Sequence, residues 1–359
     1  MRFEFAVGNP PYQEESEVCS KNKQKPMRNI FHKFQLQSDD IVSIGSVLIY
    51  PGARWIHRYG KGDGFKKFGK DLIQSIHLST IEYFPHVKDL FANVDISDGI
   101  TIVVKCCNKA AYGFDYIYCC GDSKNTVRIE RERDYWSDLL PLNPNDFAII
   151  NKIKAFVSRN GLRFLHDSIL SRNWYGIESD FVEKNPDKVR LLEPSSEIDY
   201  SSEIKLLAND KSGKSGRSRW YITNRETITT HSEYIDEFQV VVSSANAGGQ
   251  KRDNQLEIID NHSAYGRSRV GLASFKTYIE AANFYNYVQS YFIKYAFLMT
   301  DEALSSVGML VPDIMDYTAN NGYIDFNSDI DTQLYRMVGL TADEVVYLKN
   351  VVDTWRRRG

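Results

Sequence analysis

A short strand pattern that two prolines stop abruptly constrains this chain most. Aromatic or branched residues occupy every second position over residues 3–7, and after one glycine the tetrapeptide Asn9-Pro10-Pro11-Tyr12 follows. Alternation with a period of two predicts a β-strand, and proline ends such a strand because it lacks the backbone N–H that a sheet requires. The pattern therefore predicts a strand that ends in a rigid turn carrying an amide side chain and a tyrosine ring.

Strand and helix patterns alternate over the following residues. They predict a helix at 29–41, a strand at 46–50, a helix at 65–76 and a strand at 78–84. Alternating strands and helices are typical of a parallel α/β sheet. Residues 99–104 and 112–120 then indicate two long strands joined by a turn, which we expect as an antiparallel pair appended to that sheet.

The composition changes after residue 130, where Pro, Asn and Asp become frequent, and this change predicts two units, 1–130 and 131–359. In the second unit a strongly periodic helix is expected over 275–300, and a last helix begins with a capping box of Thr341 and Glu344. Short strands are expected before these helices, at 219–223, 238–243 and 256–259. The second unit is therefore predicted to be mixed α+β.

Composition limits the class of protein. The chain has 359 residues, 42% of them hydrophobic, and a net charge of -3. No apolar run reaches the roughly 18 residues that a membrane-spanning helix needs, and the N-terminus lacks a signal-peptide pattern. We expect a cytoplasmic protein without membrane contacts. The five cysteines are Cys19 and two adjacent pairs, 106–107 and 119–120, a spacing that suits neither a disulfide framework nor a zinc site. We expect reduced thiols and no metal site.

The tetrapeptide offers a pocket for a planar amine. The Asn9 amide oxygen and the Pro10 carbonyl can each accept a hydrogen bond from an exocyclic amino group, which turns the nitrogen lone pair toward an incoming methyl group. Tyr12 offers a ring on which a base swung out of a duplex can stack. The alternative interpretation is a plain turn at the end of a strand.

Residues 5–13 (FAVGNPPYQ) resemble motif IV of the gamma-class adenine-N6 DNA methyltransferases, found in type II restriction-modification enzymes with fused nuclease and methylase. Later stretches resemble the same family in the same order, at 47–55, 91–104, 238–251, 275–297 and 326–348. The resemblance implies a partial Rossmann-like methyltransferase sheet followed by a DNA target-recognition region. It also implies site-specific adenine-N6 methylation with base flipping, in a restriction-modification system.

The resemblance also assigns site residues. It implies that Asn9 and Pro10 bind the adenine amino group, with Pro11 in the same catalytic tetrapeptide, and that Tyr12 stacks on the flipped base. Phe91 holds the position of the family's motif VIII aromatic residue and would contact the base from another side; its alternative role is an ordinary core residue. Direct transfer of a methyl group to nitrogen needs neither a metal ion nor a covalent enzyme intermediate.

The resemblance further implies S-adenosylmethionine as cofactor, bound by a half of the fold that precedes motif IV. No glycine-rich turn after a strand precedes Asn9, so the binding motif is absent from this chain and is expected from a missing N-terminal half. The predicted strand at 3–7 would then present an open apolar edge. We expect either a complementary polypeptide or self-association at that edge.

Two groups of basic residues are candidates for contacts with double-stranded DNA. The first lies in a Gly/Ser-rich stretch suited to phosphate contacts and consists of Lys205, Lys211, Lys214, Arg217, Arg219 and Arg225. The second lies in the region that resembles target recognition and consists of Lys251, Arg252, Arg267 and Arg269. The alternative for the first group is a solvated surface loop.

Three other functions remain open from the sequence. The chain could be a non-catalytic DNA-recognition or specificity module. It could be a Mg²⁺-dependent nuclease, because Asp187, Glu203 and Lys205 match a Pro-Asp…Glu-x-Lys pattern. The tetrapeptide also occurs in methyltransferases that act on protein glutamine or on ribosomal RNA bases.

Overall fold

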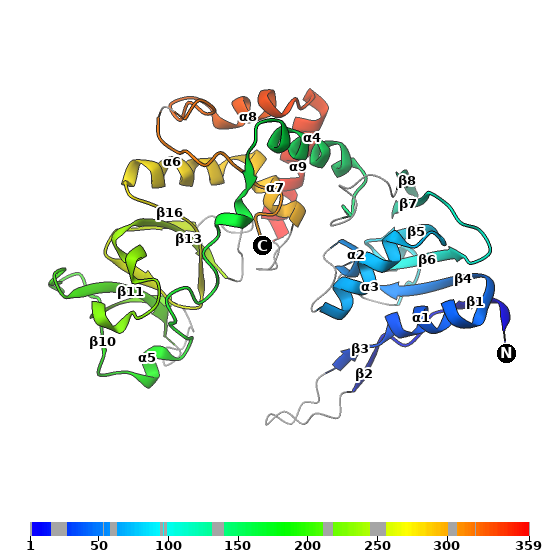
Figure 1. The fold of residues 1–359 in the computed structure, drawn as a ribbon, viewed down its shortest axis with the longest axis horizontal. Coiled ribbons are helices and arrows are strands. Elements are labelled where there is room, and N and C mark those ends of the chain that lie inside the picture. The colour runs from blue at the N-terminus through cyan, green and yellow to red at the C-terminus, as the bar shows by residue number, and fades with distance from the viewer. Residues whose placement is uncertain are drawn as a thin grey trace. The chain divides into compact units, whose positions relative to one another are not determined.

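The chain forms two compact units, 1–148 and 149–359, which are described separately (Figure 1). The computed structural model describes residues 2–15, 27–52, 54–57, 63–93, 96, 99–130, 140–210, 218–244, 256–300, 307–319 and 321–358. The division follows Ala148, inside helix α4 (Asn145–Arg159), whereas the sequence placed a boundary at residue 130.

A six-stranded sheet forms the centre of the first unit. Its strands lie in the order β1 (Phe3–Gly8), β4 (Val42–Pro51), β6 (Ile100–Cys106), β5 (Leu78–Phe84), β7 (Gly113–Cys120) and β8 (Ser123–Glu130). β1, β4, β5 and β7 run in one direction, and β6 and β8 run in the other. The predicted α/β class is confirmed.

The expected pairing of the two long strands, β6 and β7, is wrong. β5 lies between them, pairing antiparallel with β6 and parallel with β7. β5 has buried side chains on both faces of the sheet. A strand buried on both faces is typical of the interior of a sheet, where it pairs with a strand along each of its two edges. The antiparallel pair at this edge is instead β7 and β8, joined by a tight turn in which Gly121 has a φ of 55°.

Helices cover one face of this sheet. They are α1 (Phe31–Ile41), α2 (Arg54–His57) and α3 (Asp63–Gln74). Their apolar side chains pack on alternate residues of the strands in a helix-covered cluster that includes Phe31, Leu48, Tyr50, Trp55 and Phe68. A smaller cluster of Phe84, Val87, Ile100 and Cys119, the rear cluster, lies on the opposite face. Because side chains alternate between the two faces of a strand, one sheet serves both clusters.

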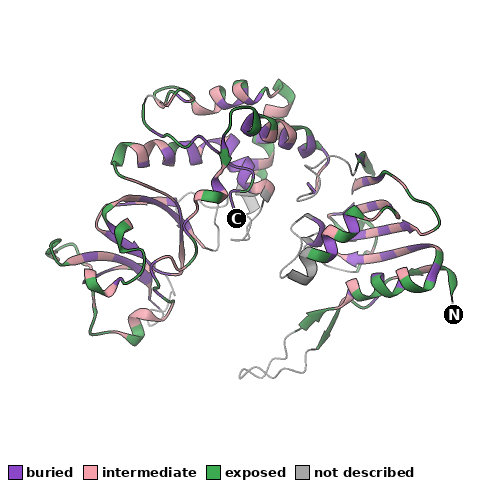
Figure 2. Ribbon diagram, viewed as in Figure 1, coloured by how far each residue is buried: buried purple, intermediate pink, exposed green. Residues whose placement is uncertain are grey.

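A hairpin follows the tetrapeptide directly. β2 (Gln13–Glu15) pairs antiparallel with β3 (Met27–Asn29), and all six residues are exposed (Figure 2). β3 leads into α1, so this hairpin connects the tetrapeptide to the first helix.

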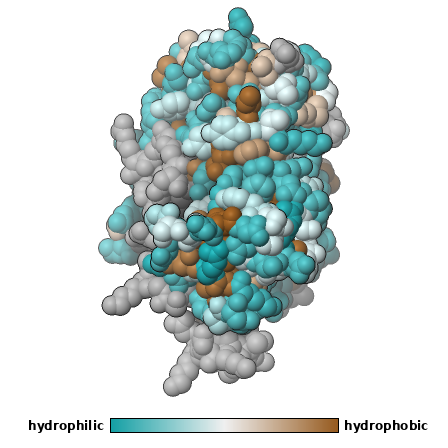
Figure 3. Space-filling model, turned by 90° about the vertical axis from the view of Figure 1, so that its left-hand side faces the viewer, coloured by the Kyte–Doolittle hydropathy of each residue, from teal (hydrophilic) through white to brown (hydrophobic). Residues whose placement is uncertain are grey.

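The second unit contains several small sheets. The largest has the order β10 (Val189–Leu191), β12 (Ser218–Asn224), β11 (Glu203–Asn209) and β15 (Ser263–Tyr265). A second sheet has the order β14 (Leu256–Ile259), β13 (Phe238–Ser243) and β16 (Arg269–Phe275), and β9 (Arg163–Phe164) pairs with β17 (Pro312–Asp313). The three strands expected from the sequence are confirmed as β12, β13 and β14. The face seen in Figure 3 is mainly hydrophilic, with small hydrophobic areas between polar residues.

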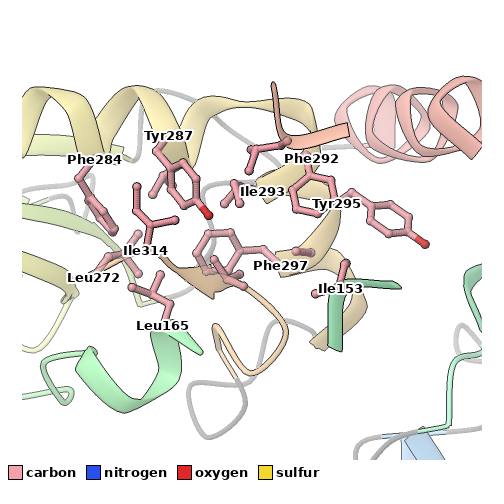
Figure 4. Close-up of a cluster of buried hydrophobic side chains, with 14 of the residues drawn as sticks. Ile153, Leu165, Leu272, Phe284, Tyr287, Phe292, Ile293, Tyr295, Phe297 and Ile314 are labelled. Atoms are coloured by element: carbon pink, nitrogen blue, oxygen red, sulfur yellow. The ribbon is translucent and has the colours of Figure 1, made fainter. Parts of the chain in front are cut away.

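The large core of this unit is aromatic (Figure 4). It gathers side chains of α4, β16 and two consecutive helices, α6 (Tyr278–Gln289) and α7 (Tyr291–Thr300). α8 (Ile330–Val338) and α9 (Ala342–Arg358) close it, and the predicted capping box of α9 is present, with Glu344 accepting from the Thr341 N–H at 2.7 Å. Among the described helices none is long and apolar enough to cross a membrane.

The single long helix expected over 275–300 is broken at Ser290. That residue has ψ of 151°, outside the helical range, and its hydroxyl accepts a hydrogen bond from the Ile293 N–H at 3.4 Å. The Asp331 carboxylate accepts from the N–H groups of Tyr291 and Phe292, each at 2.9 Å. Ser290 and Asp331 therefore begin a new helix where the apolar periodicity alone predicted continuation.

Candidate functional site

The tetrapeptide lies at the carboxyl edge of the first sheet. β1 ends at Gly8, opposite Leu48, and the next parallel strand ends at Pro51, opposite Ile100. Ile100 also pairs with Phe84, the last residue of β5. The segments that follow β1, β4 and β5 therefore meet at one edge. In open α/β sheets, ligands bind outside the carboxyl ends of the parallel strands, so this edge is the candidate site.

The turn is held by the residues that precede α1. The Tyr12 carbonyl accepts a hydrogen bond from the Ile30 N–H at 2.9 Å, and the Gln13 amide donates to the Asn29 side-chain oxygen at 2.9 Å. Pro10 is buried, whereas Asn9 is exposed. The two prolines restrict the backbone between these fixed points, so the Asn9 amide is presented to solvent from a rigid turn.

Asn9 and Tyr12 interact through their side chains. Burial raises the pKa of the Tyr12 hydroxyl, and a hydrogen bond with Asn9 opposes this rise. The exposed Asn9 amide offers its oxygen as a hydrogen-bond acceptor. The Tyr12 ring is half-buried against the helix-covered cluster.

The segment after β4 is packed closely at the same edge. The Gly52 N–H donates to the Gly99 carbonyl at 2.7 Å, and the Thr101 hydroxyl donates to the Gly52 carbonyl at 3.1 Å. Gly99 has a φ of 72°, and a Cβ there would lie 2.2 Å from the Phe84 carbonyl oxygen. Only glycine fits at this position. The last residues of β4 and β5 and the first residue of β6 are therefore held in a fixed arrangement.

Phe91 follows β5 and the short helix η1 (Val87–Asp89), and thus belongs to a segment at the same edge. Its N–H donates to the Val87 carbonyl at 2.8 Å, and its ring is half-buried in the rear cluster. Tyr12 packs on the opposite face of the sheet. The structure does not bring the two rings into one cluster, and the role of Phe91 in contacting a base stays a prediction.

Every described cation of the two predicted DNA-binding groups has an acidic partner. The pairs are Lys205 with Asp260, Arg219 with Asp210, Arg225 with Asp236, Arg267 with Glu178, and Arg269 with Glu257. Lys211, Lys214, Arg217, Lys251 and Arg252 lie outside the described residues. Three of the five acidic partners, Asp260, Asp236 and Glu178, lie outside the stretch of sequence that contains their cation. Phosphate contacts by these cations would therefore compete with ion pairs inside the protein.

The structure gathers part of these cations at one end of the second unit. The Ser218 and Ser268 hydroxyls lie 2.8 Å apart, and the Ser244 N–H donates to the Ser268 carbonyl at 2.8 Å. These contacts join the start of β12, the end of β13 and the start of β16. Arg219 and Arg267 adjoin this point with 49% and 41% of their side chains exposed.

Lys205 and Arg225 lie elsewhere in the second unit, away from Arg219 and Arg267. Arg225 follows the other end of β12, where both of its terminal guanidinium nitrogens donate to the Asp236 carboxylate. The Lys205 N–H donates to the His262 carbonyl at 2.9 Å, and its ammonium group bonds to Asp260. The structure thus divides the group that the sequence had treated as one.

Sequence reasoning missed Arg172. This exposed residue lies beside Arg267, because its Nε donates to the Arg267 carbonyl oxygen at 3.2 Å. The two arginines are 95 positions apart in the chain. A lone arginine in a polar stretch carries no pattern, so only the fold identifies it as a member of this basic end.

Two residues of the nuclease pattern, Glu203 and Lys205, are engaged with protein groups. The Glu203 carboxylate accepts from the Arg190 guanidinium at 2.7 Å and from the Asp199 N–H at 3.1 Å. Lys205 pairs with Asp260. Over the described part of the chain, no three His, Cys, Asp or Glu side chains are grouped so that they could hold a metal ion.

Comparison with known families identifies the N-terminal segment. Residues 1–91 match the model of the Eco57I restriction-modification methylase family. This segment contains the tetrapeptide, β1, β4 and β5, so the resemblance to a restriction-modification methylase family that the sequence indicated is confirmed over residues 1–91. No curated protein matches the chain.

Three solved structures match parts of the chain. The type IIG restriction endonuclease BpuSI covers 99% of this chain and 53% of its own, at 9% identity and a TM-score of 0.39. The type IIL enzyme MmeI, solved with DNA, covers 98% and 53%, at 8% identity and a TM-score of 0.40. A modification subunit of a putative type I restriction enzyme from Vibrio vulnificus YJ016 covers 33% and 25%, at 15% identity and a TM-score of 0.24.

The chain therefore spans about half the length of the first two enzymes and a quarter of the modification subunit. The TM-scores are too low to carry a functional conclusion.

Proposed function

We propose that this chain forms the target-base half of an adenine-N6 DNA methyltransferase of a restriction-modification system. The tetrapeptide carries the proposal. It places an exposed Asn9 amide in hydrogen-bond contact with the half-buried Tyr12, at the carboxyl edge of the sheet. It also lies in the segment that matches the methylase family.

The chain's own residues would bind and orient the base. An adenine that has left the duplex donates its two amine N–H bonds to the Asn9 side-chain oxygen and the Pro10 carbonyl. Its nitrogen lone pair then faces away from both acceptors, toward the methyl donor. The Tyr12 ring stacks on the base and compensates for the stacking lost in the duplex. This positioning of the base is expected to account for most of the acceleration of methyl transfer.

S-adenosylmethionine supplies an electrophilic methyl group to reactions of this class. Among the described residues β1 pairs only with β4, so its other edge is open to a further strand. We therefore assign cofactor binding to a complementary half of the methyltransferase fold.

The open side of β1 is where that half would bind. Phe3, Phe5 and Val7 are 50%, 60% and 77% exposed. A strand of a parallel sheet is usually buried on both faces, and an apolar strand edge pairs readily with another strand. A strand from the cofactor-binding half, or from a second copy of this chain, would cover these side chains.

DNA recognition is assigned to the unit of residues 149–359. Arg172, Arg219 and Arg267 lie at one end of it and are the described cations best placed to contact phosphates or base edges. Because Arg219 and Arg267 already pair with carboxylates, this surface favours selective contacts over strong non-specific attraction.

The test is the chemical identity of the product. The full chain, mixed with a cofactor-binding methyltransferase half, S-adenosylmethionine and duplex DNA, should yield N6-methyladenine detectable by mass spectrometry of the nucleosides. Asn9→Ala should abolish it. Asn125→Ala is the matched control. It removes an amide that bonds to Asn145, at positions far from Asn9 in the sequence, and should leave the yield of N6-methyladenine unchanged. Methylcytosine as product, or equal yields from both variants, would overturn the proposal.

A further inference from the structure

A cavity of about 600 Å³ opens in the second unit. It is bounded by η3 (Leu165–Ser168), the end of β16, the start of α6 and the residues that follow β17. Its volume is in the range of pockets that hold small molecules. We propose that it binds a nucleobase that carries an exocyclic amine.

Two groups of aromatic rings contribute to the lining. In one, Trp174 stacks on His231 with 3.7 Å between ring centroids and meets Tyr234 edge-on at 5.4 Å. In the other, Phe275 meets Tyr317 edge-on at 5.6 Å. Trp174, Tyr234, Phe275 and Tyr317 all line the cavity. Every nucleobase has a π face that can stack on such rings.

The charges of the cavity favour an amine over a phosphate. At its floor the buried Asp313 carboxylate accepts from Arg163 Nε at 2.9 Å, so these two charges offset each other. Asp167 and Glu237 add acidic oxygens to the lining, and the exposed Lys276 adds a cation. Carboxylates accept hydrogen bonds from exocyclic amines of bases. The base would enter with its amine inward, while its sugar and phosphate stay near Lys276.

Glu237 is the residue best placed to recognise the amine. It is half-buried, and one of its oxygens accepts from the Ser274 hydroxyl at 2.5 Å, which fixes its orientation. A carboxylate held in this way is a stronger acceptor than an amide.

The backbone around the cavity is strained. Among the described residues, the non-glycine positions with positive φ are Asn173 at 67°, His231 at 54° and Met315 at 65°. Asn173 precedes Trp174, His231 stacks on Trp174, and Met315 lines the cavity. Such conformations cost free energy and cluster where a protein holds a ligand. The non-glycine residues with positive φ among the described residues therefore lie at or beside this cavity.

Calorimetric titration of the full chain with cytidine, adenosine and uridine tests the proposal. Cytidine and adenosine should bind at least tenfold more tightly than uridine, which has no exocyclic amine. Glu237→Gln should weaken cytidine binding about tenfold and leave uridine unchanged, while Phe275→Leu should weaken all three. Glu257→Gln, which alters a carboxylate outside the cavity, is the matched control.

Two further binding experiments identify the source of the base. If a duplex with one unpaired cytosine loses affinity in Glu237→Gln, the base comes from DNA; if only free cytidine does, the ligand is a nucleoside. Cytidine binding should be unchanged in Asn9→Ala, which separates this site from the tetrapeptide and from methyl transfer. No binding of any nucleoside or of the duplex, or uridine binding equal to cytidine with Glu237→Gln unaffected, would overturn the proposal.

Discussion

Strands β1 and β13 have similar sequences and opposite surroundings. Each has six residues and begins with phenylalanine; β1 continues with Phe5 and Val7, and β13 continues with three successive valines. β13 lies between β14 and β16, and Val240, Val241 and Val242 are completely buried. β1 pairs with β4, and its Val7 is 77% exposed.

The difference shows whether each unit covers its own apolar strand with a hydrophobic core. Val240 and Val242 face the large aromatic core, while Val241 faces the cluster around Tyr175 and Tyr265, so β13 has a core on each face. The apolar residues of β1 face no core of their own unit. The second unit is therefore expected to be stable by itself, whereas the first offers a surface that a partner would cover.

The largest expected effect is a contrast in stability. Val241→Asp buries an unpaired carboxylate and should lower the free energy of unfolding by about 4 kcal/mol. Val7→Asp places the same group on an exposed strand and should change it by less than about 0.5 kcal/mol. Urea unfolding followed by circular dichroism measures both. Equal losses in the two variants would show that β1 is covered within its own unit.

A second prediction concerns the tyrosine ring of the exposed site. Tyr12→Ala removes stacking worth about 1–3 kcal/mol, so kcat/KM for DNA methylation by the assembled enzyme should fall by roughly tenfold to a hundredfold. Tyr12→Phe keeps the ring and loses only the hydrogen bond with Asn9, so it should lose less than about tenfold. A Phe variant as impaired as the Ala variant would mean that the hydroxyl, and not the ring, matters.

A third prediction compares two arginines of the second unit. Arg267→Ala removes a cation from the basic end and should reduce the slope of log affinity for DNA against log salt by about 1. Arg225→Ala removes a cation held by Asp236 at the other end of β12 and should leave the slope unchanged. Titrations of labelled duplex at several salt concentrations measure this. Equal slopes for the two variants would place the DNA elsewhere.

The smallest effect is the pH dependence of the cap of α9. Burial would raise the pKa of the Glu344 carboxyl, but hydrogen bonds from Lys152 and from the Thr341 N–H outweigh it and hold the pKa below its usual value. The ionised group therefore stabilises the fold above its unfolded pKa of about 4.3, and this contribution is lost as pH falls through the folded pKa.

Glu344→Gln should accordingly cost about 1 kcal/mol of stability at neutral pH, the usual contribution of a helix cap. The difference from wild type should disappear in acid, below the folded pKa. Thermal unfolding at a series of pH values measures it. A difference that persists unchanged into acid would show that the charge of Glu344 is not the stabilising feature.

Local patterns predicted those parts of the fold that short stretches of sequence determine. The strands β1, β4 and β5 and the helices α1 and α3 follow from apolar periodicity and from the prolines and glycines that end them. The capping box of α9 was predicted because its two residues are three positions apart. The tetrapeptide identified the family because its residues are contiguous.

Features that depend on distant residues could not be read in this way. The break at Ser290 is completed by Asp331, about 40 positions away. The insertion of β5 between β6 and β7 depends on burial in the finished sheet. Arg225 and Arg267 found partners at positions 236 and 178. In each case the deciding contact joins segments that the sequence pattern treats separately.

One measurement tests the account most directly: transfer of labelled methyl from S-adenosylmethionine to duplex DNA by the full chain, as a cofactor-binding methyltransferase half is added. The account predicts no transfer by the chain alone and a rate that rises with the added half until the two are equimolar. Val7→Asp places a carboxylate on the strand that the added half would cover, so a higher concentration of that half should be needed for the same rate. Transfer by the chain alone at the same rate as with the added half would contradict the account.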